Sequence, residues 1–367
     1  MKDIKFMRRA IELALKGQGR TSPNPMVGCV IVKNKRIIAE GWHKQCGADH
    51  AEIMALKKAG EGSRGAAMYV TLEPCFHYGR TPPCVDQVIE SGIKELVIGM
   101  KDPNPLVNGK SLKRFKAARI KIRTGVLQNE IEKINEAFIK YIKFKMPFVV
   151  AKCAQTLDGK MATMTGDSKW ITSLKTREFA RRRRDEFDAI CVGIKTVLKD
   201  NPALKGTRKK NFKKIILDST LQIPLTAKLF RGSDPSDCII AATAKVDSRK
   251  LKILHNRGIN VLICPEKKGH IHLRWLLKEL AKREIASILI EGGAHVIGCA
   301  LKENLVDKMY VYLAPKIVGD QKALNSVVGL RIQKIEKAVR LKDLNVQKIG
   351  EDFFFTGYVV RRGQGFH

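Results

Sequence analysis

The sequence predicts an α/β protein with two domains. Over most of its 367 residues, short apolar runs typical of strands alternate with stretches whose apolar positions recur at helical spacing. The chain also exceeds the roughly 250–300 residues at which a single hydrophobic core stops growing. The alternation breaks at Lys145-Met146-Pro147, where a helical pattern ends and a new strand begins. We therefore expect domains at residues 1–146 and 147–367, each with a largely parallel sheet.

In the first domain, an opening helix is predicted because Ile4, Met7, Ile11 and Leu15 recur at helical spacing. The turn Lys33-Asn34-Lys35 joins the first two strands into a hairpin. In full, strands are expected at 27–32, 36–40, 68–72, 96–100 and 120–124, and further helices at about 51–59, from about 83, at 111–118 and at 128–144.

The second domain continues the alternation. Strands are expected at 148–151, 189–192, 214–217, 238–242, 261–264, 287–290 and 309–313, and 352–360 is predicted to be a final antiparallel strand. No G-x-G-x-x-G follows the first of these strands, so a Rossmann fingerprint is absent. Glu291-Gly292-Gly293-Ala294 instead lies between a strand and a predicted helix, where backbone N–H groups can approach a phosphate. A plain turn explains this stretch equally well.

The composition is that of a globular protein, with 44% apolar and 29% charged residues. No apolar run approaches the roughly 20 residues that span a bilayer, and the N-terminus lacks the apolar core of a signal peptide. A cytoplasmic location with no membrane partner is therefore expected. The nine cysteines do not form a disulfide framework pattern, because most lie inside apolar runs. Only Cys75 and Cys84 lie among Pro, Gly and His.

The net charge of +33 raises the question of a nucleic-acid partner, because clustered Lys and Arg neutralise phosphates. The basic residues are, however, spread along the whole chain, with local runs only at Arg181–Arg184 and around 208–214. Aromatic residues make up 6%, too few for an evident base-stacking platform. A solvated basic surface with affinity for small phosphorylated ligands explains the charge better, and no nucleic-acid partner is expected.

Three short stretches predict a zinc-dependent hydrolytic deaminase. His50-Ala51-Glu52 begins a helix, Cys75 follows a strand, and Cys84 begins the next helix. A catalytic zinc takes three protein ligands, here one imidazole and two thiolates, and leaves its fourth position to water. Zinc lowers the pKa of that water from about 15.7 toward 7, and Glu52, a neighbouring carboxylate that is not a ligand, can move the proton. The pattern matches the H-x-E … P-C signature of nucleobase deaminases, except that eight residues separate the cysteines.

Taken singly, each stretch has a simpler explanation: helix capping for His-Ala-Glu, and a structural role for Pro-Cys. Two other functions also fit the combined pattern. A deaminase acting on a base within RNA or DNA would share the zinc site and exploit the positive charge. A zinc-stabilised binding module would need a fourth protein ligand, for which His77 is the candidate. Three donors beside a glutamate favour catalysis.

The chain resembles the bifunctional deaminase/reductases of riboflavin biosynthesis along nearly its whole length. In the first domain the matching stretches are PNPMVG (23–28), HAE (50–52), TLEPCFHYGRTPPC (71–84) and DPNP (102–105). In the second they are LDGKMA (157–162), DSKWITS (167–173), DNPAL (200–204), EGGA (291–294) and LAPKIVG (313–319). The wide cysteine spacing belongs to the TPPC block of this family, so it supports the resemblance.

The resemblance implies a cytidine-deaminase-like three-layer domain at 1–146, followed by a dihydrofolate-reductase-like α/β domain at 147–367. It also implies one zinc ion in the deaminase domain and NADPH in the reductase domain. The implied first reaction is the deamination of 2,5-diamino-6-(5-phosphoribosylamino)pyrimidin-4(3H)-one by zinc hydroxide. The second is the NADPH-dependent reduction of the ribose of the product to ribityl. A homo-oligomer is compatible with the sequence.

The resemblance also implies roles for individual residues. The zinc ligands are His50, Cys75 and Cys84, and Glu52 is catalytic. The deaminase substrate would contact Asn24, His77, Arg80, Asp102 and Asn104, with Arg80 suited to a 5′-phosphate. The cofactor would contact Ala154, Trp170, Thr196, Asp200, Ser219 and Gly293, and the reductase substrate Ser168, Arg184, Leu204, Arg208 and Glu291. Glu291 is also the candidate proton donor, because its carboxyl lies beside the Gly-Gly turn. Three of these residues have purely structural explanations as well: Trp170 could belong to the core, Asp200 could cap a turn, and Arg184 could lie on a solvated helix face.

Overall fold

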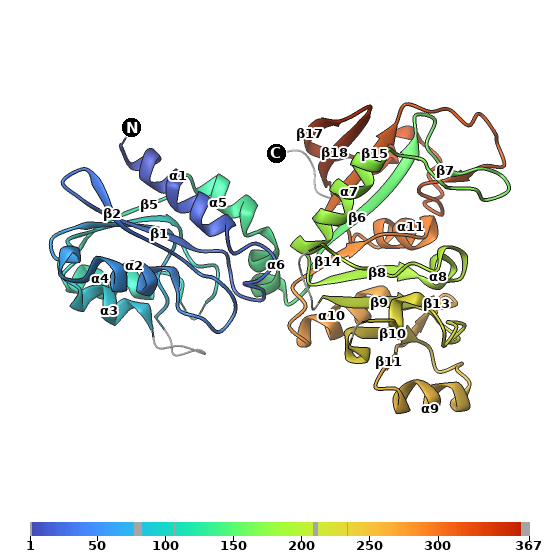
Figure 1. The fold of residues 1–367 in the computed structure, drawn as a ribbon, viewed down its shortest axis with the longest axis horizontal. Coiled ribbons are helices and arrows are strands. Elements are labelled where there is room, and N and C mark those ends of the chain that lie inside the picture. Colours follow the sequence, from blue (N-terminus) through green and yellow to red (C-terminus); the bar gives the residue numbers. More distant parts are fainter. Residues whose placement is uncertain (1, 77–82, 106, 208–211, 233, 361–367) are drawn as a thin grey trace. The chain divides into compact units, whose positions relative to one another are not determined.

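The computed structural model describes residues 2–76, 83–105, 107–207, 212–232 and 234–360. The chain divides into two compact units, Met1–Met146 and Pro147–His367, each with its own sheet (Figure 1).

The first unit consists of one five-stranded sheet and six α-helices in the described residues. Its strands are β1 (Gly28–Lys33), β2 (Arg36–Trp42), β3 (Ala67–Leu72), β4 (Glu95–Met100) and β5 (Lys121–Thr124). Its helices are α1 (Lys2–Leu15), α2 (Ala51–Ala59), α3 (Cys84–Glu90), α4 (Lys110–Ala117), α5 (Gln128–Ile134) and α6 (Glu136–Phe144), with a 3₁₀ turn at Gly60–Ser63. Helices α1 and α5 cover one face of the sheet, and α2, α3 and α4 cover the other (Figure 1).

The sheet of the first unit is mixed rather than largely parallel, which corrects the expectation from the sequence. Its strand order is β2-β1-β3-β4-β5. Strand β1 is antiparallel to both β2 and β3, whereas β3, β4 and β5 are parallel. The cause is the predicted hairpin: Asn34 and Lys35 both have positive φ values, 49° and 64°, which close a tight antiparallel turn.

Helix α2 packs directly on strand β2 at Gly41. A Cβ atom at this position would lie 2.2 Å from the carbonyl oxygen of Ala51 and 2.6 Å from the backbone nitrogen of Ala55. Atoms that are not bonded to one another do not approach so closely, so glycine is needed for this helix to approach the sheet. The contact sets the distance between the sheet and helix α2, whose first turn carries Glu52.

The single helix expected at 128–144 is two helices, α5 and α6, separated at Asn135. The Asn135 side chain is buried and bonds the backbone of Met26, accepting from its N–H at 2.8 Å and donating to its carbonyl oxygen at 3.0 Å. Asn135 itself departs from helical geometry, with φ −109° and ψ 18°. A contact across 109 residues of sequence therefore overrides the local helical pattern.

We expect Asn135→Ala to destabilise the first unit by about 1–3 kcal/mol, because two part-buried backbone groups of Met26 lose their partner. The midpoint of denaturant unfolding, followed by circular dichroism, measures the effect. Gln128→Ala is the matched control, since its side-chain amide donates to Glu132 on an exposed helix surface. Equal midpoints for the two variants would contradict this account of Asn135.

The second unit is built on a nine-stranded sheet. Its strands are β6 (Phe148–Thr156), β8 (Ala189–Gly193), β9 (Lys213–Leu217), β10 (Cys238–Ala242), β11 (Asn260–Ile263), β14 (Ser287–Ile290), β15 (Lys308–Ala314), β17 (Leu341–Ile349) and β18 (Asp352–Val359). Two small ribbons pair β7 (Lys160–Ala162) with β16 (Leu324–Asn325), and β12 (Glu266–Lys267) with β13 (His270–Ile271). The helices are α7 (Leu174–Arg183), α8 (Ile194–Asp200), α9 (Ser248–Asn256), α10 (Leu273–Lys282) and α11 (Ala294–Lys302), with short 3₁₀ turns at Arg184–Glu186, Lys228–Phe230, Pro235–Asp237 and Ile335–Lys337.

The strand order of this sheet is β11-β10-β9-β8-β14-β6-β15-β18-β17. The first seven strands in that order are parallel, and β18 and β17 add an antiparallel pair at one edge. Strand β17 was not predicted from the sequence. Its residues 342–348 are all exposed, so they lack the alternation of apolar and polar positions that a half-buried strand shows.

Within the described residues, no helix combines the length and the apolar composition that a membrane crossing requires. No disulfide joins any two of the nine cysteines, all of which the structure describes, and six of them are buried, as expected for cysteines that serve as small core residues.

Candidate functional site

Three strand and helix ends of the first unit meet at one cluster. His50 is the residue before helix α2, in extended conformation. Cys75 follows strand β3 at a distance of three residues, and Cys84 is the first residue of helix α3. The ligand atoms of these three residues all lie within 4.8 Å of one another, in the one such cluster of His, Cys, Asp and Glu found among the described residues.

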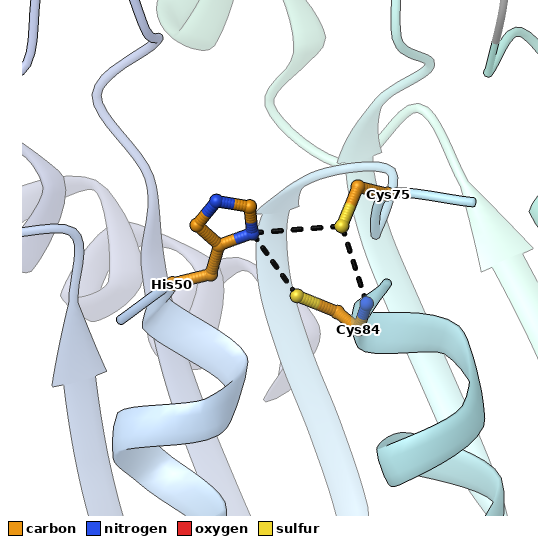
Figure 2. Close-up of side chains that lie close together, drawn as sticks. All are labelled: His50, Cys75 and Cys84. Carbon is orange, nitrogen blue, oxygen red and sulfur yellow. Dashed lines mark hydrogen bonds between the residues drawn. The ribbon is translucent and has the colours of Figure 1, made fainter. Parts of the chain in front are cut away.

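The three side chains point toward a common centre (Figure 2). His50 Nδ1 lies 3.1 Å from Cys84 Sγ and 3.5 Å from Cys75 Sγ. The backbone N–H of Cys84 donates to Cys75 Sγ at 3.2 Å. The imidazole therefore presents Nδ1 to both sulfurs, and the start of helix α3 supports the thiolate of Cys75.

The donor set suits zinc. Hydrogen bonds from the Cys84 thiol and from His50 lower the pKa of the Cys75 thiol well below its usual range. The hydrogen bond to Cys75 and burial raise the pKa of Cys84, and the hydrogen bond to Cys75 raises that of His50. One thiolate is thus stabilised before any metal binds, and one nitrogen with two sulfurs is a donor set that Zn²⁺ favours.

Glu52 lies in the first turn of α2 and is only 3% exposed. Burial raises the pKa of its carboxyl to about 7, against the effect of the His50 charge. Its side chain also shares a hydrogen bond with Cys84. A carboxyl with a pKa near neutral, beside a candidate metal-binding site, can both take up and release a proton.

Asn24 is connected to the cluster through His43, a residue that the sequence did not single out. The two ring nitrogens of His43 lie 3.1 Å from the carbonyl oxygen of Asp49 and 3.2 Å from Asn24 Nδ2. Burial lowers the pKa of His43, which favours the neutral ring, so Nδ1–H donates to Asp49 and Nε2 accepts from Asn24. This bond turns the Asn24 carbonyl oxygen away from His43, and the His43 ring stands edge-on to His50 at 5.3 Å. A lone histidine beside a strand gave no signal for this role.

Asp102 and Asn104 follow strand β4. The backbone N–H of Asn104 donates to Asp102 Oδ1 at 2.8 Å. Burial raises the pKa of Asp102 to about 7, and the charges of Glu73 and Cys75 act in the same direction. Asp102 therefore lies within the electrostatic influence of Cys75. The other expected substrate contacts in this unit, His77 and Arg80, lie outside the described residues.

In the second unit, several expected residues gather at the carboxyl ends of parallel strands. Ala154 lies near the end of β6, Thr196 in the first turn of α8 after β8, and Ser219 after β9. Gly293 is the residue before α11, with φ 77°, and the neighbouring Gly292 would place a Cβ 3.2 Å from Thr196 Oγ1. Ligands of open α/β sheets bind at this edge, and the approach of two helix starts there leaves backbone N–H groups for a phosphate.

Arg184 and Glu291 form a bidentate ion pair at the carboxyl ends of the parallel strands. Arg184 Nε and NH2 donate to the two Glu291 oxygens at 2.6 and 2.7 Å, and NH1 donates to the carbonyl oxygen of Lys205 at 2.9 Å. Burial raises the pKa of Glu291, but the Arg184 charge and hydrogen bonds outweigh it and leave the pKa below its usual value. Glu291 is therefore a carboxylate at neutral pH, which argues against its expected role as proton donor.

The other expected residues of this unit are more dispersed. Leu204, adjacent to the Arg184 partner Lys205, is buried in the core with φ 47°, and Asp200 ends helix α8. Ser168 lies on an exposed segment. Trp170 is 61% exposed and contacts the Arg177 guanidinium, 4.0 Å above its ring, which is not the core position considered as its alternative. Arg208 lies outside the described residues.

Lys152 is a further charged group at this edge that sequence reasoning missed. Its charge lowers the pKa of Glu291, and its Nζ lies 5.6 Å from the centre of the Tyr312 ring. The available signal was a lysine in the middle of a strand that is apolar from Phe148 to Ala151 and again at Cys153 and Ala154, FVVAKCAQT. Such a position is rarely filled by a lysine without a reason, since a charge in a strand interior needs a partner.

The candidate metal ligands beside Glu52 define the first unit as a zinc-dependent deaminase domain. The second unit is an α/β domain with expected ligand-binding residues at the carboxyl ends of its parallel strands. Two family models match the chain in that order. The cytidine and deoxycytidylate deaminase zinc-binding region matches residues 1–100, and the RibD C-terminal domain matches residues 147–355. The chain belongs to the RibD family.

Relatives match over nearly the full length. The riboflavin biosynthesis protein RibD of Actinobacillus pleuropneumoniae is 43% identical, covering 98% of this chain and 96% of its own. That of Escherichia coli is 38% identical, covering 96% and 98%. Among solved structures, Acinetobacter baumannii RibD has a TM-score of 0.88 at 35% identity, covering 98% of this chain and 99% of its own. A Thermotoga maritima structure, named a diaminohydroxyphosphoribosylaminopyrimidine deaminase/5-amino-6-(5-phosphoribosylamino)uracil reductase, has a TM-score of 0.85 at 36% identity, with the same coverage.

The chain is therefore a bifunctional deaminase and reductase of riboflavin biosynthesis that uses zinc and NADPH. The predicted fold class, a cytidine-deaminase-like domain followed by a dihydrofolate-reductase-like domain, is confirmed. Full-length similarity to RibD proteins also favours this function over the alternative of a deaminase acting on RNA or DNA.

Proposed function

We propose that residues 1–146 deaminate 2,5-diamino-6-(5-phosphoribosylamino)pyrimidin-4(3H)-one, and that residues 147–367 then reduce the ribose of the product to ribityl. The observation that carries the first assignment is the meeting of His50, Cys75 and Cys84 beside the buried carboxyl of Glu52. The name of the Thermotoga maritima structure supports this choice of substrate.

His50 Nδ1 and the sulfurs of Cys75 and Cys84 would hold the zinc ion. When bound, zinc supplies a Lewis acid that lowers the pKa of a water molecule toward 7. Glu52 accepts a proton from the attacking water and delivers it to the leaving amino group, a transfer suited to a carboxyl whose pKa is about 7. Its burial excludes bulk water, which would otherwise compete for the proton.

The remaining polar residues of this unit bind and orient the phosphorylated pyrimidine. Asn24, held by His43, would present its carbonyl oxygen as an acceptor. The Asp102 carboxyl, which accepts from the Asn104 backbone N–H, and the Asn104 amide would supply further polar contacts. His77 and Arg80 complete the set, with the guanidinium of Arg80 pairing with the 5′-phosphate.

In the second unit, NADPH would contact Ala154, Trp170, Thr196, Asp200, Ser219 and the turn at Gly293, and when bound it supplies the reducing equivalents. Ser168, Arg184, Leu204, Arg208 and Glu291 would bind the ribose phosphate. Arg184 orients Glu291 through two hydrogen bonds, so that the carboxylate can accept from a substrate hydroxyl. We place the enzyme in the cytoplasm, without a nucleic-acid or membrane partner.

The direct test supplies wild-type protein with the diaminopyrimidinone ribosyl phosphate and follows ammonia release and NADPH oxidation separately. We expect ammonia first, and NADPH oxidation only after the deaminated product has formed. Ammonia release without any later NADPH oxidation would sink the reductase assignment, and no ammonia release would sink the substrate assignment.

We expect Arg184→Ala to raise the KM of the reductase for its substrate by about 10- to 100-fold, and Arg182→Ala to change it less than about twofold. The reason is geometric: Arg184 reaches the sheet edge through Glu291, whereas Arg182 is exposed. Loss of one charge-assisted contact accounts for the magnitude. Steady-state kinetics on the deaminated intermediate measure both, with thermal unfolding to exclude a folding defect. Equal KM values would remove Arg184 from the substrate site.

A further inference from the structure

Glu73 is a buried carboxylate with no role in the proposed steps of deamination or reduction. It is 2% exposed and directly follows strand β3, two residues before Cys75. Its oxygens accept hydrogen bonds from the backbone N–H of Asp102 at 3.2 Å, from that of Gly109 at 2.8 and 3.1 Å, and from Ser111 Oγ at 2.5 Å. Among the described residues, these partners are N–H and O–H groups rather than cationic side chains.

All three donors belong to one segment, 102–111. Its first residue, Asp102, carries a side chain that binds the backbone N–H of Asn104. Its last residues begin helix α4, where Gly109 precedes the helix with φ 79° and Ser111 is fully buried. The Glu73 carboxylate therefore ties both ends of this segment to the strand end that leads into Cys75.

The chemistry of the contacts requires a carboxylate. Two oxygens with several lone pairs can accept from three donors at once, whereas an amide offers one acceptor oxygen and adds an N–H₂ group. A negative charge is also favourable at the start of a helix, where N–H groups lack partners. A glutamine of the same shape would leave at least one of the donors, each buried or part-buried, without an acceptor.

We propose that Glu73 is a positioning residue of the deaminase reaction. It holds Asp102 and the start of α4 at Gly109 and Ser111 against the end of β3, so that Asp102 and Asn104 keep a fixed position relative to the strand end that leads into Cys75. Glu73 thus acts on the substrate through Asp102 and Asn104 and touches neither substrate nor metal. This inference rests on the substrate roles proposed for those two residues.

The test compares Glu73→Gln with Ser111→Ala in the full-length, zinc-loaded protein. We expect Glu73→Gln to raise the deaminase KM by roughly 10- to 100-fold, the loss of a charge-assisted anchor, with zinc content and reductase kinetics unchanged. Ser111→Ala removes one donor and leaves the carboxylate with Asp102 and Gly109, so its KM should change less than about threefold. Glu73→Asp keeps the charge on a shorter side chain, and an intermediate KM is expected even if Glu73→Gln folds poorly.

A double-variant cycle separates positioning from general destabilisation. If Glu73 acts through Asp102, Glu73→Gln should add little to the KM of Asp102→Asn, because the second change removes what the first displaces. Fully additive KM effects, a KM unchanged in Glu73→Gln and Glu73→Asp, or zinc loss in proportion to activity would each overturn the proposal. Wild type inactive on the pyrimidine substrate would instead refute the proposed function itself, so the two failures can be told apart.

Discussion

Glu52→Gln is expected to lower kcat for deamination by about 10²- to 10⁴-fold, the range that a positioned general acid–base group contributes. The amide has nearly the shape of the carboxyl and cannot carry the proton between water and the leaving amino group. The change also removes a buried group whose pKa lies at about 7, without adding a charge near Cys84. We therefore expect zinc content and thermal stability close to those of wild type.

The measurement is ammonia release from the diaminopyrimidine substrate, paired with NADPH oxidation when the deaminated intermediate is supplied. The second activity should be unchanged, because Glu52 lies in the first compact unit. Glu61→Gln is the matched control, since the Glu61 side chain is 97% exposed on the same unit. A Glu52→Gln enzyme that releases ammonia within about threefold of the wild-type rate would show that another group moves the proton.

Cys75→Ser is expected to remove zinc and deaminase activity together. A serine hydroxyl remains protonated at neutral pH and is a poor zinc ligand, whereas the Cys75 thiol has its pKa lowered by Cys84 and His50. Because the ligands come from three separate segments, metal binding also cross-links the unit, and the variant should lose the zinc-dependent part of its thermal stability. Chelation of the wild-type protein should reproduce both losses.

Metal content per chain and the thermal unfolding profile, with and without added zinc, measure this effect. Cys46→Ser provides the control, a cysteine of the same unit outside the metal cluster. Unchanged zinc content in Cys75→Ser would exclude Cys75 as a ligand. Reductase activity on the deaminated intermediate should persist in both variants and after chelation.

The fold class could be predicted because alternation of strand and helix patterns is a local property of the sequence. Predictions of individual helices and strands were wrong where distant or exposed residues decide the local structure. Asn135 interrupts a helical pattern through hydrogen bonds to Met26, which no local window includes. Strand β17 pairs with β18 through its backbone, while its exposed side chains carry no strand pattern.

The candidate site likewise contains residues that could be predicted from the sequence and residues that could not. His50, Cys75 and Cys84 were singled out because zinc chemistry demands particular residue types at helix and strand ends, and the structure brings them together. Glu73 and His43 bind residues that are distant in the sequence, Asp102 and Asn24. Their roles could therefore be recognised only in the folded structure. The ion pair of Arg184 with Glu291 joins residues 107 positions apart, and it changes the charge state expected for the carboxyl.

The contact between Gly41 and helix α2 affects how natural variants of this enzyme should be judged active or inactive. A substitution at 41 would push the helix away from the sheet and carry His50 and Glu52 with it, while the three proposed metal ligands and the proposed catalytic carboxyl remain in the sequence. A genome annotation that checks only those four residues would score such an allele as active. Loss-of-function alleles should therefore include backbone-contact positions that contain no functional group at all.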